Sequence, residues 1–232
     1  MEIFRIEGTV DRIVDLSPTA REVTLRLSRP LAVPPGGFVN VFFDKDGERV
    51  RRAYTVANTN DAHDVLTLAI RNSGPGGASH LFFRDEAQGM PVTVMGPLGM
   101  NTIEKITHPR VFLFAFGIGV SAARGLAEPL LAREDLEELF IVTGSRTEDE
   151  ILYKEYFEAL AKSDARVRVR FVVSRPSQGC PFPGYIQQHV DDLDFTDATA
   201  YLCGQGSACE TLRHQIHAAE PSVEFLIESF DS

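Results

Sequence analysis

Cysteine is scarce in this 232-residue chain, which contains only Cys180, Cys203 and Cys209 and no CxxC pair. Three thiols in this spacing can build neither a disulfide framework nor a four-thiolate iron–sulfur cluster. The six histidines show no metal-ligand spacing either, so we expect no metal site. Any redox cofactor must therefore be held by other means.

Positive charge and long apolar runs are also in short supply. The chain has 23 Lys and Arg against 33 Asp and Glu, a formal net charge of −10. So acidic a chain repels phosphate backbones at long range, and we expect no nucleic-acid partner. No stretch approaches the ~18 apolar residues of a spanning helix, and the start, MEIFRIEGTV, does not resemble a signal peptide. We expect a cytoplasmic protein without a membrane span.

The first hundred residues show short runs of alternating polarity. These runs are 22–27, 38–43, 65–71 and 91–96, and turn-forming residues separate them. Such spacing predicts an antiparallel barrel or sandwich. Since 232 residues favour two domains, a second one is expected after it.

After about residue 108 the pattern changes to continuous apolar runs that alternate with helical periodicity. The runs are 111–116, 139–144, 168–174, 199–204 and 223–229, and the helical segments are 121–134, 150–163, 185–193 and 207–220. Parallel strands buried on both faces produce this pattern, so we predict a five-stranded doubly wound α/β domain. We interpret the acidic run that begins at Glu148 as the N-terminal turn of the second helix.

Glycine-rich turns and an arginine–aromatic motif are the candidate binding segments. Gly117 and Gly119 follow a buried strand directly, where glycine lets the backbone approach a pyrophosphate. Ala122 replaces the third glycine of GxGxxG, so an ordinary turn stays open as the alternative. RRAYTVAN (51–58) and SGPGGASHL (73–81) suit an anion and a flat ring, but also an ordinary strand and a surface loop.

In chain order, the segments RAYT, GGAS, GPLG, GIGVSAAR, GSRTEDEILY, VVSRP, GYIQ, CGQG and ESF resemble the ferredoxin–NADP reductase superfamily of flavoenzymes. The resemblance implies a six-stranded antiparallel FAD-binding β-barrel in residues 1–104 and a doubly wound α/β domain that binds NAD(P) in residues 105–232. It implies hydride transfer between NAD(P)H and FAD, and single-electron transfer to ferredoxin, flavodoxin or an oxygenase component. Without cluster-binding cysteines, the one-electron centre must belong to the partner.

The resemblance also implies the residues of the flavin site. Arg52 would pair with the FAD pyrophosphate, Tyr54 would pack against the isoalloxazine, and Thr55 would hydrogen-bond near flavin N5. The other residues implied for this site are Ala53, Leu68, Ala69, Ile70, Arg71, Gly76, Gly77, Ala78 and Ser79.

In the second domain the implied residues surround the nicotinamide nucleotide. The pyrophosphate loop would be Gly117, Ile118 and Gly119, and the Cys-Gly pair beside the nicotinamide would be Cys203 and Gly204. The C-terminal acid and aromatic near the flavin would be Glu228 and Phe230. Hydride transfer needs nicotinamide C4 about 3 to 3.5 Å from flavin N5. Thr55, Cys203 and Glu228 are therefore expected to position the rings rather than act as nucleophiles.

The choice of dinucleotide rests on hydroxyl and guanidinium groups at two strand ends. The residues are Ser145, Arg146, Ser174, Arg175 and Tyr185. A 2′-phosphate calls for such donors, whereas a 2′-hydroxyl is usually taken by a carboxylate. No acid replaces Arg175, although Pro183 stands where a basic residue is often found. NADP(H) is favoured over NAD(H).

Two other functions remain open. GVSAAR lacks a proline common after the glycine loop and resembles NAD(P)H:flavin oxidoreductases, which release free reduced flavin but generally lack a loop like GGAS. The second alternative is a flavin-binding electron-transfer subunit of a larger complex.

Overall fold

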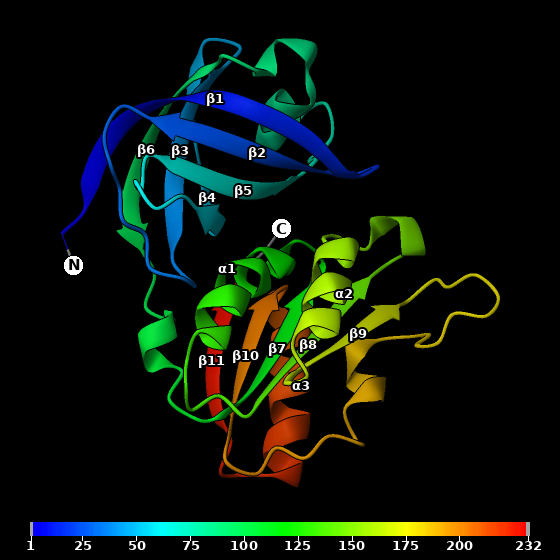
Figure 1. Cartoon of the computed structure of the whole chain (residues 1–232). Coiled ribbons are helices and arrows are strands. Elements are labelled where there is room, and N and C mark those ends of the chain that lie inside the picture. The colour runs from blue at the N-terminus through cyan, green and yellow to red at the C-terminus, as the bar shows by residue number, and fades with distance from the viewer. Residues whose placement is uncertain (1, 231–232) are drawn as a thin grey trace. The chain divides into compact units, whose positions relative to one another are not determined.

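Residues 2–230 are described by this computed structural model of the chain, which divides into two units, Met1–Thr102 (unit 1) and Ile103–Ser232 (unit 2). Unit 1 is a closed barrel of six antiparallel strands in the order β1-β2-β5-β4-β3-β6 (Figure 1). The strands are β1 (Phe4–Ser17), β2 (Ala20–Leu27), β3 (Phe38–Lys45), β4 (Glu48–Thr59), β5 (Val65–Arg71) and β6 (Pro91–Leu98).

The barrel core follows from alternation along the strands. On β3, Val39, Val41 and Phe43 are buried while the residues between them are partly exposed. The long strand β1 follows this pattern only in its first half: Ile6 and Val10 are buried while the residue before each is exposed, and the pairing with β2 shifts register between Val10 and Arg12. Such a shift re-aims the following side chains and interrupts the period of two after Val10. The strands predicted from the sequence do not include this one, although residues 4–10 alternate.

Unit 2 contains a five-stranded parallel sheet in the order β11-β10-β7-β8-β9. Its strands are β7 (Arg110–Phe116), β8 (Glu138–Ser145), β9 (Val167–Val173), β10 (Ala198–Gly204) and β11 (Glu224–Ser229). Three α-helices connect them: α1 (Val120–Leu131), α2 (Lys154–Ser163) and α3 (Gly206–Ala219). Barrel and doubly wound sheet together confirm the predicted fold class.

Helices cover both faces of the sheet (Figure 1). Cys209, Leu212 and Ile216 of α3 join one core with Phe112 and Phe114 of β7. α1 and α2 lie on the opposite face, where the Arg124 guanidinium stacks 3.8 Å from the Tyr156 ring centroid. Because successive strand residues point to opposite faces, burial on both sides produces the continuous apolar runs of these strands.

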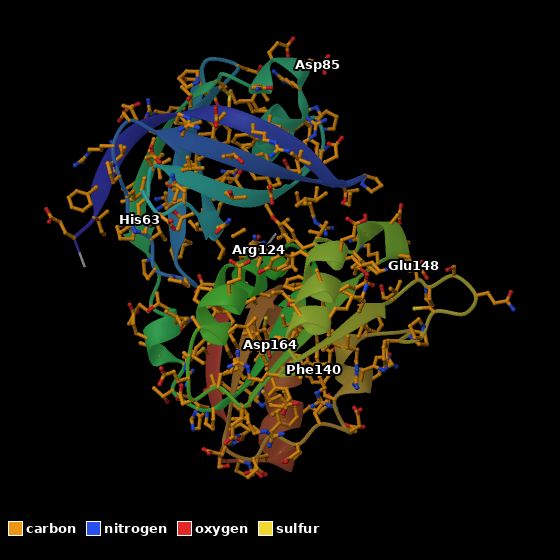
Figure 2. The ribbon with its side chains drawn as sticks, in the orientation of Figure 1. His63, Asp85, Arg124, Phe140, Glu148 and Asp164 are labelled. Atoms are coloured by element: carbon orange, nitrogen blue, oxygen red, sulfur yellow. The ribbon has the colours of Figure 1, made fainter. Side chains whose placement is uncertain are left out.

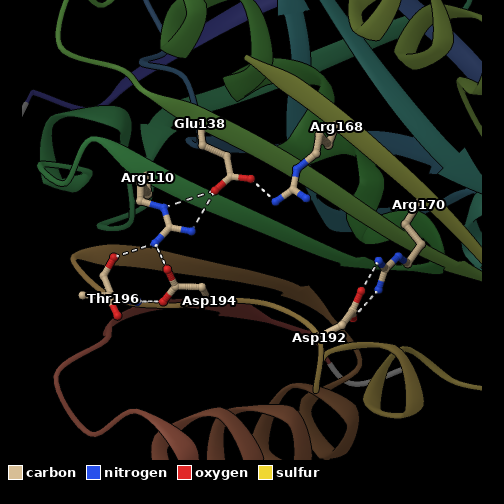
Figure 3. A network of polar contacts seen from close by, with 7 residues as sticks. All are labelled: Arg110, Glu138, Arg168, Arg170, Asp192, Asp194 and Thr196. Atoms are coloured by element: carbon tan, nitrogen blue, oxygen red, sulfur yellow. Dashed lines mark hydrogen bonds and ion pairs between the residues drawn. The ribbon is translucent and has the colours of Figure 1, made fainter. Parts of the chain in front are cut away.

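Charged side chains join the amino ends of the strands (Figure 3). Arg110 of β7 donates to the Glu138 carboxylate of β8 at 3.0 and 3.1 Å, and to Asp194 at 2.9 Å. Arg168 of β9 also pairs with Glu138. The network lies at the amino ends of the strands, at the opposite end of the sheet from the glycine loops that follow β7 and end β10.

Two helix predictions are wrong in part. In segment 185–193 only the short 3-10 helix Ile186–His189 forms. The acidic run does not begin α2: Glu148–Glu150 is a separate 3-10 turn, and α2 starts at Lys154 because Tyr153 adopts a left-handed backbone with φ 55°. No helix among residues 2–230 has the length and apolar content needed to cross a membrane.

Candidate cofactor-binding sites

The strand order of unit 2 reverses between β7 and β10. The chain continues from β7 to β8 on one side, whereas β10 lies on the other. In open parallel sheets, ligands bind outside the carboxyl ends of the strands at such a reversal. Gly117–Gly119 follows β7 and Cys203–Gly204 ends β10, so the two predicted glycine segments meet at this point.

These two loops touch through their backbones. A Cβ atom on Gly119 would overlap the Cys203 carbonyl oxygen and lie 2.9 Å from the Gly204 nitrogen. A Cβ atom on Gly204, whose φ is +141°, would lie 2.6 Å from the Phe116 Cβ. Neither position accepts a side chain, so the close approach of the two loops requires glycine at both. An ordinary turn would not require it.

The N-terminus of α1 opens directly beside this contact. Gly119 is its N-cap and offers no side chain to the first N–H groups, while the Ser121 hydroxyl donates backwards to the Ile118 carbonyl at 2.9 Å. The first N–H groups of a helix carry partial positive charge and have no partner within the helix. This arrangement suits the diphosphate of a dinucleotide.

Cys203 is fully enclosed beside the glycine contact. It is 1% exposed, and burial raises the pKa of its thiol well above the ordinary value. The thiol therefore stays protonated at neutral pH and is a poor nucleophile. In the strand register Cys203 lies between Ala115 and Glu228, which places the Glu228 side chain on the same face. Phe230, 38% exposed, donates its N–H to the Gly204 carbonyl at 3.0 Å.

The five residues predicted to select the dinucleotide lie at or beyond the ends of β8 and β9. The Ser174 N–H donates to the Ser145 carbonyl at 3.0 Å, and the Arg175 N–H to the Arg146 carbonyl at 2.7 Å. These backbone bonds hold the two segments side by side, and the side chains of Arg146 and Arg175 on them are exposed. Neither arginine forms an ion pair with a described residue. Tyr185, 66% exposed, follows Gly184.

Glu148, labelled in Figure 2, ties the same two segments together. Its carboxylate accepts from both the N–H and the hydroxyl of Ser177, each at 2.8 Å. These hydrogen bonds lower the pKa of Glu148, with the backbone N–H as the largest cause. The sequence pattern indicated only that Glu148 begins a helix, so its link to Ser177 is known from the structure alone.

In unit 1, the candidate flavin site begins with an incomplete strand pairing. β4 pairs with β3 from Glu48 to Thr55, but with β5 only through Val56–Thr59. Arg52, Tyr54 and Thr55 lie on the part of β4 that β5 leaves unpaired. A strand edge in this state retains backbone donors and acceptors for another group.

Tyr54 and Ser79 connect the two predicted flavin motifs. Their hydroxyl oxygens are 2.9 Å apart, and Ser79 lies on the 3-10 helix Ala78–Phe83. Burial raises the pKa of Tyr54 to about 12, so the phenol stays neutral. The Tyr54 ring meets Phe82 edge to face, with 6.2 Å between centroids. The motif at 51–58 and the loop at 73–81 therefore form one structure.

A cavity of about 300 Å³ adjoins this structure. It brings together the predicted residues Arg52, Gly76 and Ala78, and its lining residues are Lys45, Asp46, Glu48, Val50, Arg52, Gly76 and Ala78. Sequence reasoning missed Lys45, Asp46, Glu48 and Val50, because DKDG (44–47) indicates only a hairpin turn and the residues after it only a strand. Leu68, Ala69 and Ile70 are buried in the barrel, so only their backbone can contact a ligand.

Comparison with known proteins identifies both halves of the chain. Residues 7–103 match the oxidoreductase FAD-binding domain, and residues 113–213 match the oxidoreductase NAD-binding domain. The chain belongs to the ferredoxin–NADP reductase superfamily. The two matches confirm the predicted cofactors, FAD and a nicotinamide dinucleotide.

Three relatives are 25% to 29% identical to this chain over the aligned residues. It is 29% identical to the phenol hydroxylase P5 protein of Acinetobacter pittii over 85% of the chain, but spans only 57% of that protein. It is 29% identical to ferredoxin–NADP reductase B of Sorangium cellulosum, covering 81% of the chain and 78% of the relative. The crystal structure of the Amycolatopsis cytochrome P450 reductase GcoB matches with a TM-score of 0.88 at 25% identity. The match covers 99% of this chain and 71% of GcoB.

Proposed function

We propose that this chain oxidises NAD(P)H and delivers the electrons singly to a separate redox protein. One observation carries the proposal: a single chain holds two sites suited to anionic nucleotides, the cavity beside Arg52 and the glycine contact at Gly119. Residues 1–104 would serve as the FAD-binding domain and residues 105–232 as the NAD(P)-binding domain.

The residues of unit 1 fit FAD. When bound, FAD supplies the conversion of a two-electron donor into one-electron steps, which no side chain provides. Arg52 would pair with the pyrophosphate together with Gly76, Gly77, Ala78 and Ser79. A Cβ on Gly77 would lie 2.7 Å from the Ser73 carbonyl, so the loop depends on glycine for its shape. Tyr54 and Thr55 would hold the ring, while Ala53 and Leu68–Arg71 would contribute backbone groups.

The residues of unit 2 fit a nicotinamide dinucleotide. Gly117, Ile118 and Gly119, with the N-terminus of α1, would bind its diphosphate. We further propose NADPH as the preferred donor, because the residues that flank the ends of β8 and β9 are the hydroxyl and guanidinium donors Ser145, Arg146, Ser174, Arg175 and Tyr185.

Thr55, Cys203 and Glu228 would orient the reacting rings. The protonated state of the buried Cys203 thiol supports a positioning role rather than a nucleophilic one. Phe230 and Gly204, linked by a 3.0 Å hydrogen bond, would complete this region of unit 2.

The electron acceptor is proposed to be an oxygenase component, a ferredoxin or a flavodoxin. The names of two relatives, a phenol hydroxylase protein and a ferredoxin–NADP reductase, support this class of partner. The three cysteines are free thiols, which supports a reducing, cytoplasmic location.

Steady-state oxidation of NADPH by purified, FAD-loaded protein tests the proposal. We expect turnover with a one-electron acceptor such as a ferredoxin, and no saturation with added riboflavin. Flavin-free protein whose rate saturates with added riboflavin or FMN would instead show a flavin reductase that releases its product. Failure to oxidise NADPH with any artificial acceptor would indicate a subunit without independent turnover.

A further inference from the structure

Lys45 extends the candidate flavin site beyond the family motifs. It is the last residue of β3, opposite Glu48 in the hairpin, and its Nζ donates to the Gly76 carbonyl at 2.8 Å. The ammonium group has three donors, and this bond uses one of them. The bond ties the β3–β4 hairpin to the glycine loop, and Lys45 and Gly76 both line the cavity.

The charges around the cavity favour an anion. Two cations, Lys45 and Arg52, and two carboxylates, Asp46 and Glu48, line it. Arg84 lies 3.6 Å from Asp46 and offsets its charge. Neither lining cation forms an ion pair with a residue in the described range 2–230. One positive charge is therefore in excess, and two cations are available for two phosphate groups.

Strand register gives the order of groups along the site. Val39, Val41 and Lys45 of β3 lie opposite Tyr54, Arg52 and Glu48 of β4. From Val39 to Lys45 is six residues, or about 20 Å of strand. Tyr54, which would bind the ring, is thus at one end of this row and Lys45 is at the other. Arg52 lies between them, nearer to Tyr54 than to Lys45.

We propose that Lys45 binds the adenylate half of FAD and makes unit 1 select FAD over FMN. The inference rests on the proposed function of unit 1 as a flavin site. FMN ends at its single phosphate, which Arg52 would reach, whereas FAD continues along β4 toward the hairpin. Lys45 acts on that continuation only, and Glu48 offers a carboxylate acceptor for ribose hydroxyls at the same end.

Flavin titration of the apoprotein tests this assignment. Wild type, Lys45→Gln, Lys45→Arg and Arg51→Gln would each be titrated with FAD and, separately, with FMN, and flavin fluorescence would be followed. Arg51 is the matched control, because it is an exposed cation of β4 whose side chain points to the opposite face from Arg52. Thermal unfolding of each variant verifies that the barrel is intact.

We expect Lys45→Gln to weaken FAD binding about tenfold or more, as for the loss of a charged hydrogen bond. FMN affinity stays unchanged, Lys45→Arg restores most of the FAD affinity, and Arg51→Gln changes neither. An equal loss for FAD and FMN, or no loss for either, overturns the assignment while leaving a flavin-binding unit 1 intact. Wild type that binds neither flavin contradicts the proposed function itself.

Discussion

The two candidate sites are built by opposite means. In unit 1 the site depends on side chains: the Tyr54–Ser79 hydrogen bond, the Lys45–Gly76 link and the cation Arg52. In unit 2 it depends on backbone, because Gly119 and Gly204 bring two loops into direct contact at the strand ends. Charge and hydrogen bonds therefore dominate the first site, and steric fit dominates the second.

This difference determines how each site should respond to substitution. Removing one hydrogen-bonding group from unit 1 costs affinity in steps, since the others remain. Adding a single methyl group in unit 2 forces backbone apart, which misplaces everything that the loops hold. The predictions below test this contrast, from the largest expected effect to the smallest.

Gly119→Ala should have the largest effect. Its Cβ would overlap the Cys203 carbonyl oxygen, so one of the two loops must move. We expect kcat/KM for NADPH to fall about 100-fold, while FAD affinity stays unchanged. Stopped-flow kinetics and flavin titration measure the two quantities separately.

Gly89→Ala is the control for the added methyl group, because no atom lies within 4 Å of its Cβ and Gly89 belongs to neither candidate site. Its φ of +83° makes the substitution cost some stability, but FAD binding and turnover should be retained. A mild Gly119→Ala variant would break the contrast between the two sites, and loss of turnover in Gly89→Ala would show that an added methyl group disturbs the protein wherever it is placed.

Arg52→Gln should weaken FAD binding about 10- to 100-fold, because a charged hydrogen bond to phosphate is lost. The dinucleotide site is unaltered, so binding of NADP⁺ should match wild type. Equilibrium titration with each ligand measures both. Unchanged FAD affinity would remove Arg52 from the site.

Arg175→Ala should lower the ratio of kcat/KM for NADPH to that for NADH by about tenfold. The expected change lies mainly in the KM for NADPH, since the guanidinium would contact only the 2′-phosphate. Lys162→Ala, at the exposed end of α2, is the matched loss of a cation. A ratio that stays the same would place the 2′-phosphate elsewhere.

Acid should destabilise unit 2 through two carboxylates. Hydrogen bonds from Arg166 lower the pKa of Asp164 to about 2, and the Thr196 backbone N–H is the largest cause that lowers the pKa of Asp194 to about 2. Because the folded pKa lies below the ordinary value of 3.8, this stabilisation is present above about pH 4 and is lost as pH falls through 2.

Urea unfolding at several pH values between about 4 and 2 measures this loss. The double variant Asp164→Asn, Asp194→Asn should show a shallower pH dependence than wild type. Asp61→Asn, at an exposed carboxylate of unit 1, should follow the wild-type curve. Identical slopes for all three proteins would contradict the assignment.

Much of the fold could be predicted because local patterns and packing agree. The runs at 111–116 and 199–204 correspond to β7 and β10 within one residue, since strands buried on both faces must be apolar throughout. The first half of β1 alternates and could have been predicted, whereas its continuation to Ser17 could not, because irregular pairing after Val10 interrupts the period. The start of α2 depends on the left-handed backbone at Tyr153, a residue that gives no such signal.

Only part of each candidate site could be predicted from the sequence. The glycines at 117 and 119 indicated a phosphate loop, but their contact with Cys203 and Gly204 depends on a strand order that local patterns do not encode. The role of Lys45 could not be predicted for a related reason: its hydrogen bond to Gly76 joins residues 31 apart in the chain and forms only in the folded barrel.

Anaerobic stopped-flow mixing of the FAD-loaded protein with NADPH and with NADH tests most directly whether the two sites work together. We predict loss of the oxidised-flavin absorbance with both donors and a faster rate with NADPH. Equal rates, or a faster rate with NADH, would contradict the proposed dinucleotide preference. No loss of absorbance with either donor would contradict the central claim that one chain binds both cofactors for hydride transfer.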